Sequence, residues 1–218
     1  MDRRLKTLFD LAGEGETFLD IGCDHGLVSL KALKSGKFKR VIITDISAKS
    51  LQKAINLLQS YGDSVKAVVT DGFNGILDDV SVAFIAGMGG EEITKILLDA
   101  KKLPPKLVLS PQGHGEKVRK TLISLGYKLV NDFTLFSSGK YYDAISAIKG
   151  EDYYTNLQLK YGRENLLKKP TDFVNKLNKE LQFKTSILDR NLSEEDNQLI
   201  LKEINEIKEI LNENNWRI

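Results

Sequence analysis

The feature that most constrains the fold is a regular alternation of short apolar segments with helical patterns over the first 150 residues. Five strand candidates are near-continuously apolar and rich in β-branched residues, as strands covered on both faces should be. They span residues 17–22, 40–45, 65–70, 80–86 and 106–110. Helical patterns lie between them, at residues 27–35, 48–60, 91–100 and 116–125. This alternation predicts right-handed βαβ crossovers and therefore a doubly wound α/β domain, a parallel sheet with helices on both faces.

The pattern changes after Gly126. Two longer strand candidates, residues 127–136 and 141–148, flank the polar sequence Ser-Ser-Gly-Lys at 137–140. Two strands joined by so short a polar segment form an antiparallel hairpin. We therefore expect a mostly parallel sheet of seven strands that ends in an antiparallel pair.

The remaining residues form a second region with a different composition, helical throughout. Only Gly162 lies beyond Gly150, and apolar side chains recur there at three- or four-residue spacing. The two stripes consist of Phe173, Leu177, Leu181, Lys184 and Leu188, and of Ile200, Ile204, Ile207 and Leu211. Ser193 with the acidic residues that follow it has the character of a helix start, after a turn at Asn191 and Leu192. We predict two domains, residues 1–150 and a C-terminal antiparallel coiled-coil hairpin over 151–218.

Composition excludes several classes of protein. Among 218 residues there is one cysteine, Cys23, so no internal disulfide can form, and this fits a reducing cytoplasm. Two histidines and one cysteine are too few for a convincing zinc site. No apolar run approaches the length that spans a bilayer, and charges interrupt the apolar residues of the N-terminus where a signal peptide would need none. We expect no membrane partner, and no obligate protein partner is evident.

Charge is unevenly distributed between the two regions. Residues 1–150 contain 21 Lys and Arg against 17 Asp and Glu, a balance of +4, whereas residues 151–218 contain 11 against 13, a balance of −2. A mildly basic α/β domain can present a local phosphate-binding surface. The candidate residues are Arg3, Arg4, Lys6, Lys117, Arg119, Lys120 and Lys140, with Lys168, Lys169, Lys176 and Lys179 on the helical region.

Polar or glycine-rich residues follow each of the five predicted parallel strands. Open α/β sheets bind ligands beyond the carboxyl ends of their strands, where the strand order reverses. The five segments are residues 20–26, 45–47, 71–73, 86–90 and 110–114. Their clustering at one sheet edge favours a ligand site over ordinary turn chemistry.

The first of these segments indicates what kind of ligand binds. Asp45 lies 19 residues beyond Gly26, a spacing at which a carboxylate accepts hydrogen bonds from ribose hydroxyls. The segment does not have the G-x-G-x-x-G pattern that seats a pyrophosphate. It instead places Asp20 and Asp24 at the approach, and these carboxylates suit a cofactor with positive charge, such as S-adenosyl-L-methionine. Asp71 could accept a hydrogen bond from the adenine amino group.

Several motifs together resemble the bacterial tRNA (adenine-22, N1) methyltransferase family. They are DIGCDHG, TDIS, VTDGF, IAGMGG and SPQGH, with Arg4-Leu5 near the start and Gly139-Lys140-Tyr141-Tyr142-Asp143 in the last strand. The resemblance covers nearly the whole chain and implies a Rossmann-like, S-adenosylmethionine-dependent methyltransferase domain with a C-terminal coiled coil. It also implies tRNA as the partner.

The resemblance assigns roles to particular residues. It implies cofactor contacts by Arg4, Asp20, Gly22, Asp24, Gly26, Asp45, Ile46, Asp71, Gly72, Ala86, Gly87 and Met88. N1 of adenine carries a free lone pair, so we expect positioning rather than base catalysis, with a carboxylate stabilising the cationic product. The catalytic candidates are Asp24 for that carboxylate, and His25 or Tyr142 for a hydrogen bond to the base or stacking on it. Two residues of the motifs also have a purely structural alternative. Asp24 could simply cap the helix that begins near Gly26, and His114 could be a local helix cap rather than a contact to the base.

Three other functions remain as alternatives. A small-molecule methyltransferase would share every cofactor residue but would have a lidded pocket. A nicotinamide-dependent oxidoreductase shares the fold but lacks its glycine pattern here. A catalytically silent module could recruit a partner through the helical hairpin.

Overall fold

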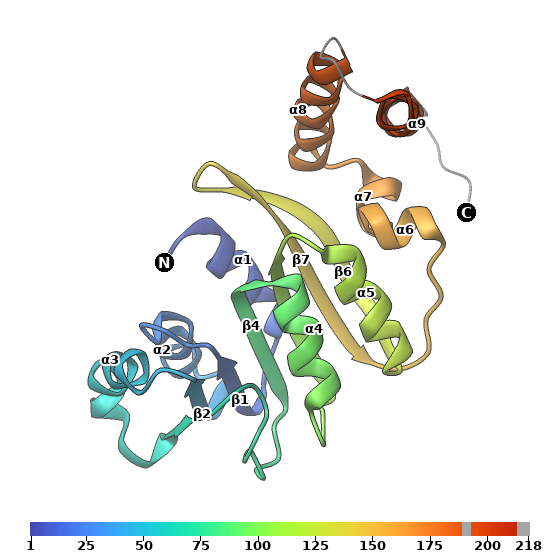
Figure 1. Cartoon of the computed structure of the whole chain (residues 1–218). Helices are drawn as coiled ribbons and strands as arrows, with labels where there is room; N and C mark the ends of the chain where they lie inside the picture. Colours follow the sequence, from blue (N-terminus) through green and yellow to red (C-terminus); the bar gives the residue numbers. More distant parts are fainter. Residues whose placement is uncertain (189–192, 213–218) are drawn as a thin grey trace.

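The computed structural model describes residues 1–188 and 193–212. Within these residues one seven-stranded sheet has the order β3-β2-β1-β4-β5-β7-β6 (Figure 1). Its strands are β1 (Gly15–Ile21), β2 (Phe38–Asp45), β3 (Val65–Val69), β4 (Val82–Gly89), β5 (Lys106–Gln112), β6 (Tyr127–Ser137) and β7 (Lys140–Lys149). The neighbouring strands from β3 through β5 pair in parallel, whereas β7 pairs antiparallel with both β5 and β6. The predicted fold class and the terminal hairpin are confirmed.

Helices cover both faces of the sheet, so the hydrophobic core forms two clusters, one on each face. One cluster lies under α1 (Arg3–Ala12), α2 (Leu27–Lys34) and α3 (Ala48–Leu58), which is followed by a 3-10 turn at Gln59–Ser64. The other lies under α4 (Gly90–Asp99) and α5 (Gly115–Ser124). The sequence did not predict α1, whose start is capped by the Asp2 carboxylate as it accepts the Leu5 N–H at 2.8 Å. The charges within that segment occupy the exposed side of an amphipathic helix that buries Leu8 and Phe9.

The strand order reverses next to β1. The chain first builds outward from β1 through β2 to β3, then crosses back so that β4 pairs on the other side of β1. The loops after β1 and β4 therefore leave the sheet toward opposite faces and open a crevice between them.

The C-terminal region consists of α6 (Asn156–Tyr161), α7 (Arg163–Lys168), α8 (Thr171–Leu188) and α9 (Glu194–Asn212). It has a hydrophobic cluster of its own, in which Phe173 and Leu177 of α8 join Ile207 and Ile210 of α9. Further along α8, Lys184 pairs with Glu203, which precedes Ile207 and Ile210 in α9, so the two helices run antiparallel.

Of the predictions for the C-terminal region, the structure confirms the start of the last helix. Ser193 caps α9 as expected, accepting the Asp196 N–H at 3.1 Å. Asn191 and Leu192, in the predicted turn, lie outside the described residues. Coiled-coil packing and the domain division at residue 150 stay predictions.

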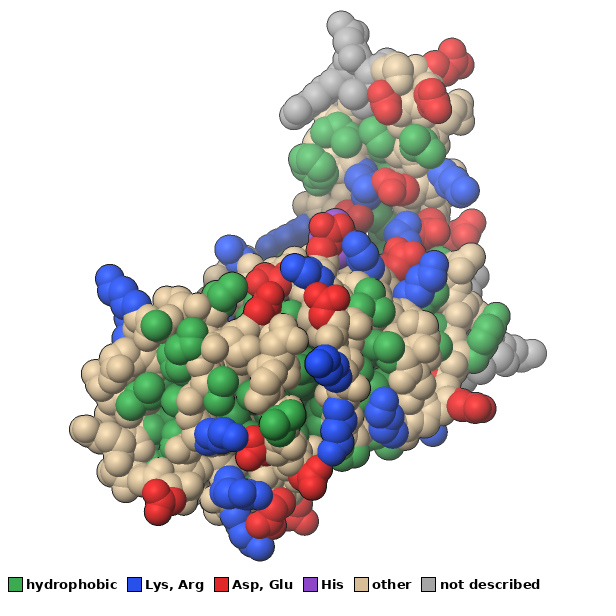
Figure 2. All heavy atoms as spheres, turned by 60° about the horizontal axis from the view of Figure 1, so that its bottom comes forward, with side chains coloured by type: hydrophobic (Ala, Val, Ile, Leu, Met, Phe, Trp, Pro, Cys, Tyr) green, Lys and Arg blue, Asp and Glu red, His purple; other side chains and the backbone are tan. Residues whose placement is uncertain are grey.

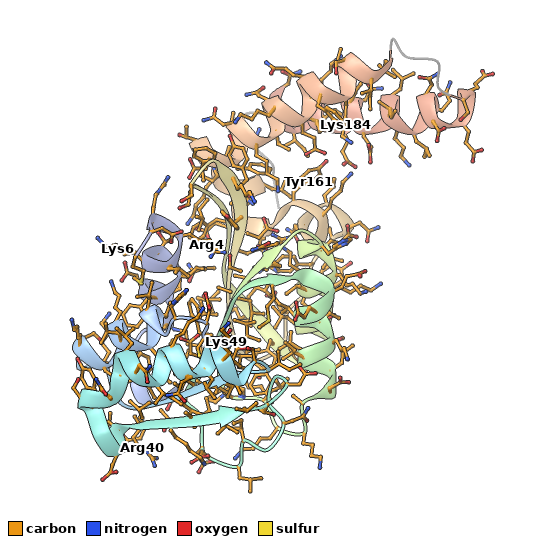
Figure 3. The ribbon with its side chains drawn as sticks, turned by 60° about the vertical axis from the view of Figure 1, so that its left-hand side comes forward. Arg4, Lys6, Arg40, Lys49, Tyr161 and Lys184 are labelled. Carbon is orange, nitrogen blue, oxygen red and sulfur yellow. The ribbon has the colours of Figure 1, made fainter. Side chains whose placement is uncertain are left out.

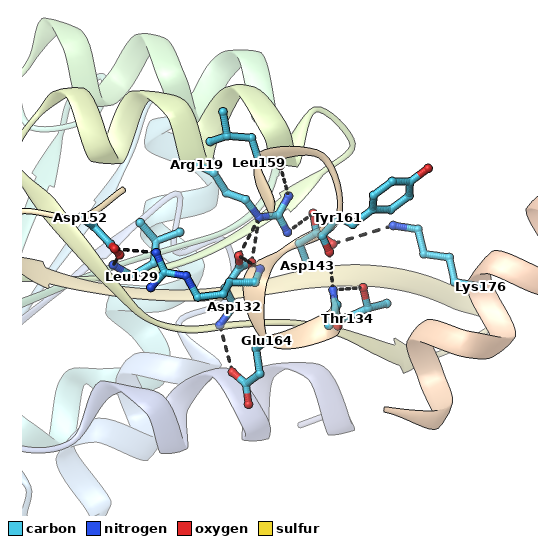
Figure 4. A network of polar contacts seen from close by, with 12 residues as sticks. Arg119, Leu129, Asp132, Thr134, Asp143, Asp152, Leu159, Tyr161, Glu164 and Lys176 are labelled. Atoms are coloured by element: carbon cyan, nitrogen blue, oxygen red, sulfur yellow. Dashed lines mark hydrogen bonds and ion pairs between the residues drawn. The ribbon is translucent and has the colours of Figure 1, made fainter. Parts of the chain in front are cut away.

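A buried charge network joins the sheet, α5 and the C-terminal region (Figure 4). The Arg119 side chain is 1% exposed; its Nε donates to both oxygens of Asp132 at 2.8 and 3.0 Å, and Nη2 lies 3.1 Å from Asp143. Nη1 donates to the carbonyl of Leu159, and Asp132 also accepts the backbone N–H of Arg163. Burial lowers the pKa of Arg119, but the two carboxylates outweigh it and raise that pKa above its ordinary value.

Arg119 was predicted to contact phosphate, and this was wrong. The sequence shows a basic residue in a helix with polar neighbours, but the helix turns this position toward β6, where two carboxylates from the terminal hairpin surround it. Lys117 and Lys120, predicted with it, are exposed, and Lys117 pairs with Glu91 at 3.3 Å.

One face of the molecule carries mixed charge (Figure 2). On the face shown in Figure 2, Lys and Arg side chains are interspersed with Asp and Glu, and the C-terminal helices project from the larger body. No helix within the described residues is both long and apolar enough to traverse a bilayer. The same residues contain no group of three or more His, Cys, Asp or Glu side chains arranged to hold a metal ion.

Candidate functional site

A cavity of about 380 Å³ lies at the carboxyl ends of β1, β2 and β4, where the strand order reverses. It brings together most of the predicted site residues. Those lining it are Arg4, Asp20, Gly22, Asp24, His25, Asp45, Ile46, Asp71, Gly72, Ala86, Gly87 and Met88. Gly26 and Tyr142 do not line it. The segment after β5 is also absent from its lining.

Asp20 is the deepest charged group of the cavity. Its side chain is at the end of β1 and the residue is 4% exposed. The Ser29 hydroxyl donates to it at 2.6 Å, and no ion pair forms between Asp20 and any cation of the described residues. Burial raises the pKa of Asp20 to about 6, because hydrogen bonds from Ser29 offset only part of the desolvation and Asp45 adds repulsion. A buried carboxylate without a counter-ion, facing an open cavity, is suited to bind a cation.

The turn after β1 is shaped by a close approach between two loops. Gly22 has a φ of 70°, and a Cβ there would lie 2.1 Å from the Met88 side chain at the end of β4. Glycine is required both for the left-handed backbone and for the space. Two residues on, Asp24 has a φ of 44°, and its N–H donates to the Asp45 carboxylate at 3.3 Å. The loops after β1 and β2 are thus tied together on the side of the cavity where a ribose was predicted.

Gly26 serves the packing of the helices rather than the cavity wall. It is the N-cap of α2 with a φ of 68°, and a Cβ there would lie 2.9 Å from that of Ala54 on α3. No side chain caps this helix, so the alternative that Asp24 is only a helix cap is wrong. The Asp24 carboxylate is instead exposed at the cavity mouth, 3.5 Å from Nε2 of His25.

Arg4 reaches the cavity from α1. Its guanidinium stacks on the ring of Tyr142, 4.5 Å from the ring centroid, and its Nε and Nη1 are buried without a hydrogen-bond partner among the described residues. On the same helix, Lys6 projects outward into solvent (Figure 3). Tyr142 therefore lies beside the cavity, behind Arg4. As predicted from their neighbouring positions, Tyr141 faces the other side of the strand, where it packs on Phe136.

The outer end of the cavity presents apolar and acidic groups. Ile46 is 75% exposed there, next to Asp71 and Gly72. Glu92, in the first turn of α4, also lines this end and was missed by sequence reasoning. Acidic residues are common in the first turn of a helix because they interact favourably with its dipole. The position of Glu92 in the sequence therefore did not indicate a ligand contact.

The β4 end forms an open wall. Gly87 has a φ of 91° and, like Gly89, has no atom within 4 Å of where a Cβ would lie. The Gln112 side chain from β5 donates to the Gly87 carbonyl at 3.2 Å. His114 is at the N-cap position of α5, but its side chain makes no capping hydrogen bond, so its predicted capping role was wrong.

The cavity as a whole is acidic. Arg4 is the one Lys or Arg among the described lining residues, against five carboxylates, those of Asp20, Asp24, Asp45, Asp71 and Glu92. Cys23 packs beneath the same loop, where burial raises the pKa of its thiol. The arrangement favours a ligand with positive charge and repels a pyrophosphate.

The fold and this cavity define a Rossmann-like domain with a nucleoside-type ligand site that lacks a pyrophosphate cradle. Comparison with known families agrees, because the family model described as "Methyltransferase domain" matches residues 1–145. The chain belongs to this methyltransferase family.

Relatives extend the similarity to the whole chain. The Bacillus subtilis tRNA (adenine(22)-N(1))-methyltransferase is 29% identical to this chain. The alignment is 228 positions long, gaps included, and covers 98% of this chain and 96% of that protein. A candidate tRNA (m1A22) methyltransferase of Streptococcus pneumoniae, solved with S-adenosyl-L-methionine, superposes with a TM-score of 0.87 at 25% identity, over 96% of this chain and 99% of that one. A Mycoplasma capricolum structure, TrmK with S-adenosyl-homocysteine, has the same fold, with a TM-score of 0.88 at 20% identity over 97% and 98% of the two chains.

Proposed function

We propose that this protein transfers the methyl group of S-adenosyl-L-methionine to N1 of adenine 22 in tRNA. The observation that carries the proposal is the acidic cavity at the sheet edge, with Asp20 buried and without a counter-ion. The names of the relatives supply the tRNA position. We propose the cytoplasm, where tRNA is found, as the site of action.

The lining residues fit the cofactor group by group. S-adenosyl-L-methionine carries an ammonium and a sulfonium, for which Asp20 and its acidic neighbours provide negative charge. Its carboxylate needs donors, and Arg4 has two buried N–H groups without partners. Asp45 would accept from the ribose, Ile46 would pack on adenine, and Asp71 would accept from the adenine amino group. When bound, the cofactor supplies an electrophilic methyl group.

The protein's part in methyl transfer is positioning and charge stabilisation. N1 of adenine attacks with its own lone pair, so no proton has to leave first. Gly87 and Gly89 leave bare backbone at the β4 wall, where an extruded base can approach. Asp24, at the cavity mouth, would stabilise the positive charge that develops on the base. His25 beside it would hydrogen-bond the base, and Tyr142 would hold Arg4 in place.

Nucleoside mass spectrometry tests the proposal. Unmodified tRNA incubated with the protein and S-adenosyl-L-methionine should gain 1-methyladenosine, and tRNA with guanine at position 22 should gain none. Transfer to a small molecule but not to any tRNA would contradict the proposal and favour a small-molecule methyltransferase.

An Asp24→Ala variant tests the role given to the carboxylate. We expect kcat to fall about 10²-fold, the scale of one lost transition-state contact. Asp63→Ala is the matched control, an exposed acidic residue in the 3-10 turn after α3. Transfer by Asp24→Ala at the wild-type rate would remove Asp24 from the reaction.

A further inference from the structure

A second groove, apart from the cofactor cavity, is lined by residues at the tip of the β6–β7 hairpin and by residues of α8. Its volume is about 440 Å³. Two aromatic rings and an array of amide side chains line it with one lysine: Phe136, Tyr141, Asn175, Asn178, Gln182 and Lys179. The reaction proposed above uses none of these residues.

The aromatic floor is held in a fixed position. Phe136 and Tyr141 are cross-strand partners, with ring centroids 4.9 Å apart. The Phe136 N–H donates to the Asp172 carboxylate at 2.9 Å, and Arg3 of α1 donates to the Phe136 carbonyl at 3.1 Å. Arg3 also pairs with Asp172 at 3.2 Å, so the one carboxylate of the groove lining is neutralised.

The lysine gives the groove its charge. Lys179 is exposed, and its ammonium lies over both rings, 5.4 Å from the centroid of Phe136 and 5.2 Å from that of Tyr141. No carboxylate of the described residues forms an ion pair with it. An exposed side chain of this length can leave the rings and reach a phosphate while a base takes its place on them.

We infer that this groove binds an unpaired nucleotide of tRNA, other than the target adenine, by stacking its base on Tyr141 and pairing its phosphate with Lys179. Aromatic faces, adjacent amides and a free cation together match a nucleotide's base, base edge and phosphate. Nucleobase recognition by amides also fits better than docking of an apolar protein segment.

The position of the groove indicates how nucleotide binding there would assist methyl transfer. Tyr142, next in the strand, faces Arg4 and the cofactor cavity, so the groove and the reaction site lie on opposite faces of one hairpin. Extruding the target base breaks its stacking with neighbours. A second nucleotide held on the other face would keep the displaced strand in place during methyl transfer. This inference rests on the proposed function, because it takes tRNA as the partner.

Three variants test the inference with the full-length protein. Tyr141→Leu keeps apolar bulk without an aromatic face, Tyr141→Phe keeps the face, and Lys179→Ala removes the cation. Lys101→Ala is the matched control, an exposed lysine in the loop before β5, which lies beside the end of β7 that is far from the hairpin tip. Filter binding gives the Kd for unmodified tRNA, steady-state transfer gives KM and kcat, and calorimetry gives cofactor affinity.

We expect Tyr141→Leu to raise the Kd and KM for tRNA about tenfold, and Tyr141→Phe to change them less than twofold. Lys179→Ala should weaken binding and reduce the slope of log Kd against log salt by about one, whereas Lys101→Ala should leave it unchanged. Cofactor affinity should stay at the wild-type value in all four.

Two results would overturn the inference, and they are distinguishable. If the wild type methylates tRNA while Tyr141→Leu and Lys179→Ala bind tRNA as the wild type does, the groove has no such role and the proposed function stands. If the wild type leaves every tRNA unmethylated, the proposed function fails and this inference with it. Lys179 is a surface residue, so its variant keeps the test decisive even if Tyr141→Leu does not fold.

Discussion

Two regions of this molecule bury charged side chains, and they do so in opposite ways. In the network of Arg119, Asp132 and Asp143, the guanidinium nitrogens lie 2.8 Å from the Asp132 carboxylate and 3.1 Å from the Asp143 carboxylate. In the cavity at the carboxyl ends of β1, β2 and β4, Asp20 has a hydroxyl as its side-chain hydrogen-bond partner and further carboxylates near it. A paired buried charge fixes structure, whereas an unpaired one beside a cavity marks a place where a ligand completes the pairing.

Arg119→Met gives the largest expected effect and tests the structural side of this comparison. It leaves two carboxylates without their cation, which costs roughly 3–5 kcal/mol of unfolding free energy. Denaturant unfolding measures this loss, and Lys120→Met, on the next and exposed residue, should change stability by less than about 0.5 kcal/mol. Equal stability of the two variants would mean that the network does not fix the structure.

Gly22→Ala gives an intermediate effect at the cavity itself. Alanine at a φ of 70° costs about 1 kcal/mol in backbone strain. The new Cβ also displaces the end of the flexible Met88 side chain, which lines the cavity, so we expect weaker cofactor binding. Gly36→Ala is the control, because Gly36 has a similar φ of 66° but open space around it. It should also lose about 1 kcal/mol from backbone strain, but keep the wild-type cofactor affinity. If Gly22→Ala binds the cofactor as tightly as Gly36→Ala does, the position of Met88 is unimportant for the site.

The sequence was sufficient to predict the sheet, because its central strands β1, β2, β4 and β5 are largely buried on both faces and therefore read as continuous apolar runs. The edge strand β3 has no buried residue, and its β-branched valines were what predicted it. It also predicted most of the cavity lining, since parallel strands bring their carboxyl ends to one edge. It could not show that Arg119 is buried, because that depends on Asp132 and Asp143 arriving from a distant hairpin. Glu92 was missed for a similar reason, as a contribution from α4 that only the packed structure reveals.

The affinity for S-adenosyl-L-methionine as a function of pH tests most directly that unpaired Asp20 marks the cofactor site. The cationic cofactor favours the ionised carboxylate, so affinity should be full above the Asp20 pKa of about 6 and fall as pH drops below it. Calorimetry should show wild-type Kd rising about tenfold between pH 7 and pH 5. Asp20→Asn should bind about tenfold or more weakly at pH 7, without this component of the pH dependence; other titrating groups act on both proteins alike. An Asp20→Asn variant with wild-type affinity and the wild-type pH profile would contradict the account.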